Sequence, residues 1–565
     1  MTTTSSAAPV RADARAPRTG LRIGWLTPWR ALFLGWLCAF LIGAAWAVGS
    51  PMSSSPDEPD HIVKAEATVH GELTGGSPSK YPGKTYVEVP ADVSVPGGDI
   101  SCFAFHANVS AACVPAQHVS SSRALVPKLT GVGAYNPLYY AIVGVPSLFL
   151  AGNKAWFAMR LVSALLNSFF IGILFFAAVQ LRRAPAFLAW TAIALTPEAM
   201  YLSGMVNPNS TEIVGCAALA ALAWLVVSDP TRHRLAERMT LIAIAGVLVG
   251  NTRALSPLYV FLILLAVVIS FPFRGSADLL RRRSVLVGLA VGVAGMIVAA
   301  LWTLFISAPA GFIPTSTPHD GFGKAFITTL TNTTDFGRMM VGRTGWLDTS
   351  LPGAVYIGWA AITGFVVMAV VIAGFKRRSF GAFLLMVAVV LVPPIVQAPS
   401  VKTFGYIWQG RYTLPVYVAM ILIAGIAAER YVLRRLDAPR IVAIVTAATG
   451  VGQLTAWVVT YRRYATGITA PWRDLLHATP WAPPGGPIPV TVIFLLGTVG
   501  TCVLSFFVSR SVVAAGGTGF ELSEAAIDEE TGEGTDGAAG AVPDDASRDL
   551  AREPAGPAWA PEPGR

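Results

Sequence analysis

The sequence predicts an all-α, polytopic membrane protein, and three features of its 565 residues lead to this fold class. Hydrophobic residues make up 54% of the chain and charged residues only 13%, whereas a soluble domain carries roughly 25% charged residues. Apolar runs near 20 residues long, which is about the length that crosses a bilayer as a helix, recur along the chain. Arg and Lys cluster in the short connections between these runs, as topology signals do. The net charge of +9 therefore reports on membrane orientation, and we expect no nucleic-acid partner.

Both ends of the chain are predicted to be disordered, cytoplasmic segments. Residues 1–30 are rich in Ser, Ala, Pro and Arg, and residues 511–565 in Gly, Ala, Pro, Glu and Asp, so neither can bury an apolar core. The apolar run 31–49 is too long for a signal peptide and lacks a convincing cleavage site, so we expect a retained first helix. Residues 31–510 then form one transmembrane domain, whose first outer loop, residues 51–156, is long and punctuated by Gly, Pro and Ser.

We expect about twelve transmembrane helices, with both ends of the chain in the cytoplasm. The apolar run 137–150 is not counted, because a crossing there would place every later basic connection outside; we expect it to lie at the membrane interface. The expected spans are 31–49, 157–179, 186–204, 211–228, 239–252, 257–272, 285–308, 353–374, 380–397, 413–429, 441–460 and 489–509. The basic residues then expected in the cytoplasmic connections are Arg182, Arg183, Arg232, Arg234, Arg238, Arg274, Arg281, Arg282, Arg283, Lys376, Arg377, Arg378, Arg430, Arg434, Arg435 and Arg440.

An acidic stretch directly after the first span is the most promising place for chemistry. Asp57, Glu58, Asp60 and His61 lie within five residues, and carboxylates this close repel unless a proton or a cation comes between them. Asp57 or Glu58 can serve as a general base, and the sequence leaves the choice open. The spacing of His61 from the two acids suits a hydrogen-bonded pair or a metal site, but no second His/Asp cluster completes a coordination sphere. The alternative is a polar loop that merely begins outside the membrane.

The other unusual polar stretches fall on the same, extracytoplasmic side and suggest recognition of a phosphorylated, lipid-anchored molecule. Arg253 and Arg411 at helix ends offer forked donors for phosphate oxygens. Aromatic residues there can stack on sugar rings or belong to the interfacial aromatic belt. The remaining candidates for substrate binding are Asp60, His61, Tyr139, Tyr140, Asn207, Asn209, Trp346, Asp348, Gln409 and Tyr412.

Two of the five cysteines, Cys102 and Cys113, share the first outer loop. If that loop faces an oxidising compartment, they can form a disulfide. Cys38, Cys216 and Cys502 lie in apolar spans and are expected to be small core residues.

The polar motifs resemble the DUF2142 family of predicted bacterial membrane proteins, over roughly residues 30–510. The motifs that carry this resemblance are, in order, Ser55-Pro56-Asp57-Glu58-Pro59-Asp60-His61, Tyr135-Asn136-Pro137-Leu138-Tyr139-Tyr140, Asn207-Pro208-Asn209, Gly345-Trp346-Leu347-Asp348 and Gln409-Gly410-Arg411-Tyr412. The family name conveys no activity.

The layout is also similar to the GT-C superfamily of polyprenyl-phosphate-sugar glycosyltransferases, which have a large first outer loop and an acidic pair directly after the first helix. Asp57-Glu58 occupies the position of that pair, and the resemblance implies that one of the two is the base. Asp60 and His61 are additions to the usual pair. The segments 137–140 and 160–164 resemble the Pro-Leu-Tyr-Tyr and Arg-Leu-x-Ser-Ala pattern of lipid A aminoarabinose and protein mannose transferases.

Together these features predict an integral-membrane hexosyl- or pentosyltransferase of a bacterial plasma membrane. It would move a sugar from a polyprenyl-phosphate donor to an extracytoplasmic acceptor, a cell-envelope glycan or glycolipid, among membrane lipids. Because a lipid phosphate is a good leaving group, no cofactor is required, and a divalent metal is not supported by the sequence. Two alternatives remain: a transporter or flippase of a lipid-linked glycan, which predicts charges in mid-span, and a non-catalytic scaffold of envelope assembly.

Overall fold

The computed structural model describes residues 25–515, except 79–80, 82, 94–99, 116–119, 182–183, 230–233, 308–319, 375, 433–437 and 478. The predicted terminal segments therefore lie outside the described residues, apart from residues 25–30 and 511–515. The same holds for five of the predicted cytoplasmic basic residues, namely Arg182, Arg183, Arg232, Arg434 and Arg435.

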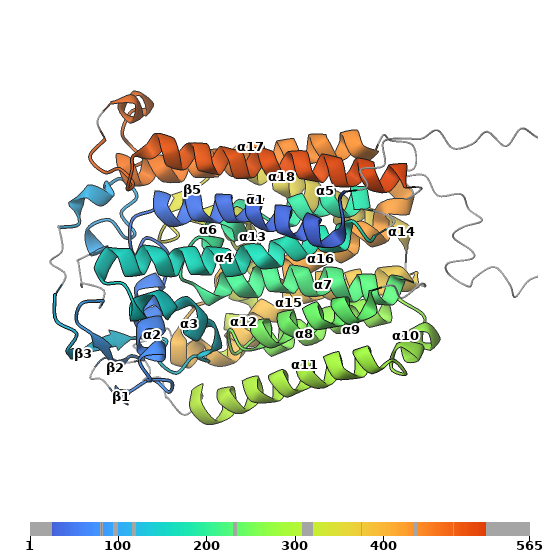
Figure 1. The fold of residues 1–565 in the computed structure, drawn as a ribbon, viewed down its shortest axis with the longest axis horizontal. Helices are drawn as coiled ribbons and strands as arrows, with labels where there is room; N and C mark the ends of the chain where they lie inside the picture. The colour runs from blue at the N-terminus through green and yellow to red at the C-terminus, as the bar shows by residue number, and fades with distance from the viewer. Residues whose placement is uncertain are drawn as a thin grey trace, which may run out of the picture. The chain divides into compact units, whose positions relative to one another are not determined.

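Long helices that run side by side make up most of the described part of the chain (Figure 1). Nine of the helices described are long and apolar enough to cross a membrane, which confirms a helical, multi-pass membrane fold. They are α1 (Pro28–Gly49), α4 (Gly152–Ala178), α7 (Pro208–Ser228), α11 (Arg283–Trp302, continued by a π-helical turn, Thr303–Ser307), α14 (Gly353–Ala373), α15 (Arg377–Phe404), α16 (Gly410–Val432), α17 (Ala438–Ala465) and α18 (Pro487–Ala514).

The three other predicted spans are occupied by shorter helices, so the count of about twelve crossings stays a prediction. Two of them correspond to α8 (Leu235–Gly250) and α9 (Ser256–Ile269). The third is divided into α5 (Ala184–Ala194) and α6 (Pro197–Ser203). The break has a local cause, because Pro197 has no N–H to continue α5 and the Thr196 side chain caps the new helix by accepting from the Ala199 N–H.

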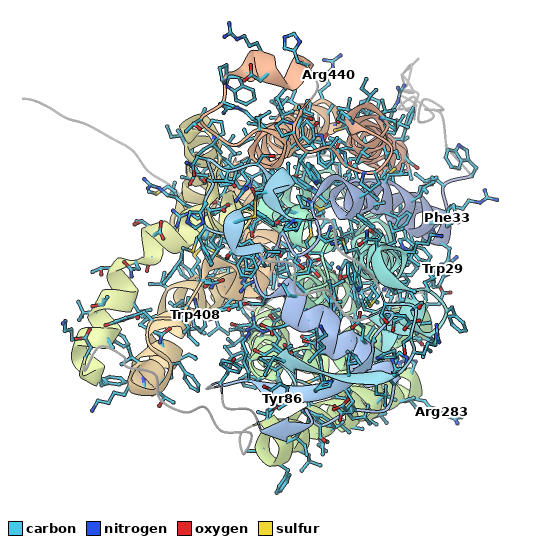
Figure 2. All side chains as sticks on the ribbon, turned by 90° about the vertical axis from the view of Figure 1, so that its left-hand side faces the viewer. Trp29, Phe33, Tyr86, Arg283, Trp408 and Arg440 are labelled. Atoms are coloured by element: carbon cyan, nitrogen blue, oxygen red, sulfur yellow. A yellow bond between two sulfur atoms is a disulfide. The ribbon has the colours of Figure 1, made fainter. Side chains whose placement is uncertain are left out.

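The first outer loop packs across one end of the helices, which we call the loop end. Helix α2 (Glu58–Val69) lies there across the direction of the long helices, beside a three-stranded antiparallel sheet (Figure 1). The sheet consists of β1 (Ser77–Pro78), β2 (Thr85–Pro90) and β3 (Leu125–Thr130), and the sequence analysis did not predict it. Figure 2 looks onto the loop end, where Tyr86 marks the sheet and Trp408 marks the segment before α16.

The apolar run 137–150 forms two short helices, α3 (Leu138–Val143) and the 3-10 helix η3 (Val145–Leu148). At six and four residues they are too short to cross a bilayer, and their expected place at the membrane interface stays a prediction. The remaining short elements are η1 (Ile100–Cys102), η2 (Ala111–Cys113), α10 (Phe273–Leu279), α12 (Phe322–Thr331), α13 (Thr333–Gly342), β4 (Arg343–Thr344), β5 (Thr349–Ser350) and η5 (Trp472–Leu476). Of these, α10 lies at the end of the helices opposite to α2 (Figure 1).

The core is centred on α7 and α16, which are equally buried, and α11 lies at the periphery. In the most apolar stretch of α7, 94% of the residues are buried among other helices, whereas only 17% are buried in α11. Helix α11 packs mainly on α8, and its remaining surface carries exposed Leu, Ile and Val side chains.

Candidate functional site

A buried arginine on α4 organises the segment that follows the first helix. Arg160 is fully buried, and its guanidinium uses all five of its N–H donors. Nε and Nη2 donate to the two carboxylate oxygens of Glu58 at 2.7 and 2.6 Å. The other three bonds go to the backbone carbonyls of Ala47, Ser50 and Pro51, at 2.7–2.9 Å. The Arg160–Glu58 ion pair and the bonds of Arg160 to these carbonyls thus join the end of α1 to the start of α2 and fix the turn between them.

This arrangement separates the two candidate bases, which the sequence had left equivalent. Glu58 is fully buried, and besides Arg160 it also accepts from the backbone N–H of Val206 at 3.2 Å, so neither oxygen is available to a substrate. Asp57 instead caps α2 in the left-handed backbone region, with φ 64°, and its side chain is 47% exposed. We therefore assign Glu58 a structural role and keep Asp57 as the candidate base.

Arg411, at the start of α16, holds Asp57 in place. Its Nη2 donates to Asp57 Oδ2 at 2.5 Å and its Nη1 to the Pro56 carbonyl at 3.2 Å. Asn207 Nδ2 donates to the same carbonyl at 3.2 Å. Burial alone would raise the pKa of the Asp57 carboxyl, but the charges of Arg411 and, more weakly, Arg253 outweigh it, so its pKa lies below the ordinary value. Asp57 is therefore ionised at neutral pH.

Two guanidinium groups meet on one aromatic ring. The Cζ atoms of Arg253 and Arg411 lie over the Tyr412 ring, 4.3 and 5.1 Å from its centroid. Among the described residues, Arg253 has no carboxylate oxygen within 4.0 Å of its side-chain nitrogens. The Nε of Arg411 is buried and has no hydrogen-bond partner. Arg411 thus keeps an unused donor although it already pairs with the partly exposed carboxylate of Asp57, which favours an anionic ligand.

A cavity of about 180 Å³ lies next to this cluster. Arg253 and Tyr412 both line it, together with the buried carboxylate Glu212 of α7. Four further aromatic residues line it, namely Tyr135, Tyr259, Trp302 and Trp408. Its remaining lining residues are Asn136, Gly250, Ala254, Leu255, Ala299, Thr303, Ser307, Val396, Gln397, Ser400 and Ile407. The cavity therefore combines a cation with aromatic walls, as a phosphate joined to a sugar would require.

Three predicted substrate-binding residues pack inside the loop end instead of lining the cavity. His61 is buried, its Nδ1 lies 2.8 Å from the Tyr140 hydroxyl, and the two rings stack with centroids 5.9 Å apart. Burial lowers the pKa of His61 to about 3, so its ring is neutral at physiological pH. Tyr139 is also buried and pairs with the Ser163 hydroxyl at 2.9 Å. These side chains position α2 and α3 and give a ligand no access.

Asp60 and Asp348 also have structural partners. Asp60 accepts from the Gly131 N–H at 3.0 Å and lies 3.5 Å from Lys84 Nζ, which ties α2 to the end of β3. Asp348 is buried in a 2.6 Å ion pair with Arg463 of α17. Both carboxylates are thus occupied by the protein itself.

The last four predicted residues lie around the turn that carries Asp57 or at the start of α16. Trp346 Nε1 donates to the Ser53 carbonyl at 3.0 Å, and Asn207 caps α7. Asn209 donates to Glu212 at 3.2 Å and so supports a wall of the cavity. Gln409 has a buried Oε1 atom with no hydrogen-bond partner, two residues before Arg411. Of these four, only Gln409 offers an unused polar atom near the cation cluster.

The structure joins Cys102 and Cys113 by a disulfide in the first outer loop. Phe103, next to it, packs edge-on against Tyr464 of α17, with ring centroids 6.4 Å apart. Ser110, in the closed segment, donates to the Tyr464 carbonyl at 3.0 Å. The disulfide therefore stabilises a segment that rests on α17.

Sequence reasoning missed the roles of Arg160, Glu212, Tyr135 and Trp302. The signal for the first two was available, because a charged residue within an apolar span needs a buried partner. The two aromatic residues carry no such signal. Among the residues that the structure describes, no group of three or more His, Cys, Asp or Glu side chains is placed to hold a metal ion.

A family model described as a predicted membrane protein (DUF2142) matches residues 40–422, more than half of the chain. No curated protein matches this chain. Among solved structures, the chain is similar to the crystal structure of ArnT from Cupriavidus metallidurans bound to undecaprenyl phosphate. The two are 16% identical, the match covers 87% of this chain and 78% of that chain, and the TM-score is 0.41.

Proposed function

The chain belongs to the DUF2142 family of membrane proteins, and from the site at its loop end we propose that it is an integral-membrane glycosyltransferase with a polyprenyl-phosphate sugar as donor. The observation that carries the proposal is the pair of guanidinium groups, Arg253 and Arg411, that meet on Tyr412 beside a cavity, with the partly exposed carboxylate of Asp57 bound to one of them.

The donor phosphate would lie between the two arginines. A guanidinium presents its N–H groups in a planar fork that matches phosphate oxygens, and the Nε of Arg411 has no partner within the described residues. The aromatic residues of the cavity, among them Trp302 and Trp408, would pack against the sugar ring. Gln409 offers a carbonyl oxygen for a sugar hydroxyl.

Asp57 would act as the base toward the acceptor hydroxyl. As the acceptor oxygen bonds to the anomeric carbon, the bond from that carbon to the phosphate oxygen breaks and the lipid phosphate keeps its electron pair. The proton of the acceptor passes to Asp57, and Arg253 and Arg411 stabilise the charge that grows on the leaving phosphate. Because this anion is stable without further help, the proposed reaction requires no metal.

We further propose that the loop end faces the extracytoplasmic side of a bacterial plasma membrane, with both ends of the chain in the cytoplasm. The Cys102–Cys113 disulfide supports this orientation, because disulfides persist in oxidising compartments. The acceptor would then be a cell-envelope glycan or glycolipid.

The test uses the purified full chain in lipid nanodiscs with a panel of radiolabelled polyprenyl-phosphate sugars. Asp57→Asn should retain donor binding and lower turnover by about 10²–10⁴-fold, the contribution typical of a general base. Arg253→Gln should weaken donor binding itself. The matched control is Asp335→Asn, because Asp335 is also a partly exposed carboxylate paired with an arginine at 2.8 Å, but that arginine is Arg343 and not one of the two proposed to bind the phosphate.

Unchanged turnover in Asp57→Asn would remove this residue as the base while keeping the enzyme. If the wild-type protein bound no donor of the panel, the transferase proposal would fail. A transporter of a lipid-linked glycan would instead bind the donor without releasing the lipid phosphate.

A further inference from the structure

An exposed aromatic residue in the first outer loop has a strained backbone. Phe105 lies in the segment that the Cys102–Cys113 disulfide closes, its side chain is 69% exposed, and its φ is 64°. A left-handed backbone is an outlier for a bulky residue, and an exposed ring gains little from burial to offset the strain. Backbone strain of this kind clusters at sites that bind ligands. Phe105 is therefore a candidate for ligand contact.

A second aromatic ring joins Phe105 to the turn that carries Asp57. The rings of Phe105 and Trp346 are tilted by 59°, and their centroids lie 5.4 Å apart. Leu347, next to Trp346, also has a left-handed backbone, with φ 59°. Trp346 Nε1 donates to the carbonyl of Ser53, four residues before Asp57. Four residues span at most about 14 Å even when extended, so one oligosaccharide can contact the aromatic pair and Asp57 together.

One buried arginine fixes both loops that carry the aromatic pair. Arg463 of α17 is fully buried and donates to the carboxylate of Asp348, in the turn between β4 and β5, at 2.6 Å. Its two Nη groups also donate to the carbonyls of Phe103 and Val109, at 2.5 and 3.1 Å, on either side of the exposed ring. Because these bonds hold the two rings before a ligand arrives, binding loses little conformational entropy.

The surroundings of the aromatic pair favour a carbohydrate over a lipid. Arg462 and Arg463 lie in the last turn of α17, and cations at a helix end mark the edge of the hydrocarbon region. The disulfide-closed segment rests on this end of α17, outside that edge. The side chains of Ser101 and His106 beside it are polar and exposed. An aromatic face with polar neighbours suits a sugar ring, which presents apolar C–H faces and polar hydroxyl groups.

We infer that Phe105 and Trp346 form a platform for a sugar ring of the acceptor, one hydroxyl of which reaches Asp57. This inference rests on the proposed function and adds to it the chemical class of the acceptor, a saccharide, and the side chains that recognise it. Neither ring belongs to the lining of the Arg253 cavity, so acceptor and donor contact different side chains.

The experiment measures binding of fluorescently labelled bacterial cell-envelope oligosaccharides to the purified full chain in phosphatidylcholine nanodiscs. Phe105→Leu removes the planar ring but keeps an apolar side chain, whereas Phe105→Tyr keeps the ring. The matched control is Phe149→Leu, because Phe149 is 77% exposed in the same outer loop and contacts no other aromatic ring among the described residues. Binding of the radiolabelled polyprenyl-phosphate sugars is measured in the same samples.

We expect the wild type to bind at least one oligosaccharide and Phe105→Leu to weaken that binding at least about fivefold, with donor binding unchanged. Phe105→Tyr should stay within about twofold of the wild type, and Phe149→Leu should change neither ligand. Phe105→Gly should lose oligosaccharide binding but unfold at no lower denaturing-detergent content than the wild type, because glycine adopts the left-handed region without strain.

Two results would overturn the platform: no oligosaccharide binding by the wild type, or equal binding by the wild type and Phe105→Leu, as a merely apolar contact with lipid predicts. Earlier unfolding of Phe105→Gly would show that the ring serves the fold and would also overturn it. Donor binding in the same samples decides separately whether the proposed function stands. A wild type that binds an oligosaccharide through Phe105 but binds no donor would refute the transferase and leave a saccharide site.

Discussion

The substitution Glu58→Gln should damage folding, whereas Asp57→Asn should damage turnover. Within the described part of the chain, Glu58 is the only carboxylate that pairs with the fully buried Arg160, and it accepts two of the five hydrogen bonds of that side chain. Glutamine removes the negative charge and places an amide NH₂ against a guanidinium N–H. Loss of one partner of a buried ion pair costs about 3–5 kcal/mol. Against a total stability of about 5–15 kcal/mol for a folded domain, this is a large fraction.

Asp57 also pairs with an arginine, but its own side chain is 47% exposed. Water screens such a pair, so Asp57→Asn should cost about 1 kcal/mol or less. The two neighbouring substitutions therefore differ by at least about 2 kcal/mol in unfolding free energy, the difference between the two figures above. Arg160→Lys should behave like Glu58→Gln, because an ammonium has three donors in place of the five that the site uses.

The assay measures the free energy of unfolding in mixed micelles of mild and denaturing detergent, and in parallel the turnover per folded molecule. Glu58→Gln should unfold at lower denaturing-detergent content, and the fraction that remains folded should retain donor binding. Asp57→Asn should unfold close to the wild type and lose turnover. If Glu58→Gln were as stable as the wild type and only its turnover fell, Glu58 would be the functional carboxylate and the assignment made here would be reversed.

Two further predictions concern the loop end. Since burial lowers the pKa of His61 to about 3, the unfolded chain binds a proton at pH 5 that the folded chain excludes, so stability falls as the pH drops below the ordinary value of 6.5. Between pH 7 and pH 5 the wild type should lose about 2 kcal/mol more than His61→Gln, and equal losses in unfolding free energy would contradict a neutral, buried His61. Replacing Cys102 and Cys113 by Ser should destabilise the closed segment by up to about 3 kcal/mol. Amide hydrogen exchange should then speed up around Ser110 and leave the α4 amides unchanged; uniform acceleration throughout the chain would contradict this local role.

Hydropathy and the charge pattern predicted the membrane fold because both act on long stretches of chain. Every predicted span has a helical counterpart, and the run 137–150 is too short in its helical parts to cross. The break at Pro197 and the sheet of the first outer loop were not predicted, although Pro197 and the alternating residues of β2 are local signals. Local sequence patterns therefore predicted where the long helices lie, but they did not predict the sheet of the first outer loop or the break at Pro197.

The site could be predicted only in part, because its contacts join distant residues. Glu58 and Asp57 are adjacent in sequence, yet their arginine partners lie 102 and 354 positions away, respectively. Which carboxylate is buried depends on the left-handed turn at Asp57; aspartate adopts this region more often than most residues, but its presence in the sequence does not locate such a turn. The cation cluster was foreseen from Arg253 and Arg411, whereas the ring that brings them together, Tyr412, was one aromatic candidate among several.

Arg411 couples the two parts of the proposed mechanism. Without a ligand, it pairs with Asp57 and keeps the pKa of that carboxyl low, which makes Asp57 a weak base. A bound phosphate would share the guanidinium, reduce the positive potential at Asp57 and raise its pKa. Asp57 would thus become a stronger base only when the donor is in place. This order would disfavour proton transfer from an acceptor before the sugar donor has bound. The coupling depends on the Arg411 side chain, which contacts both the turn before α2 and the Tyr412 ring over which Arg253 also lies.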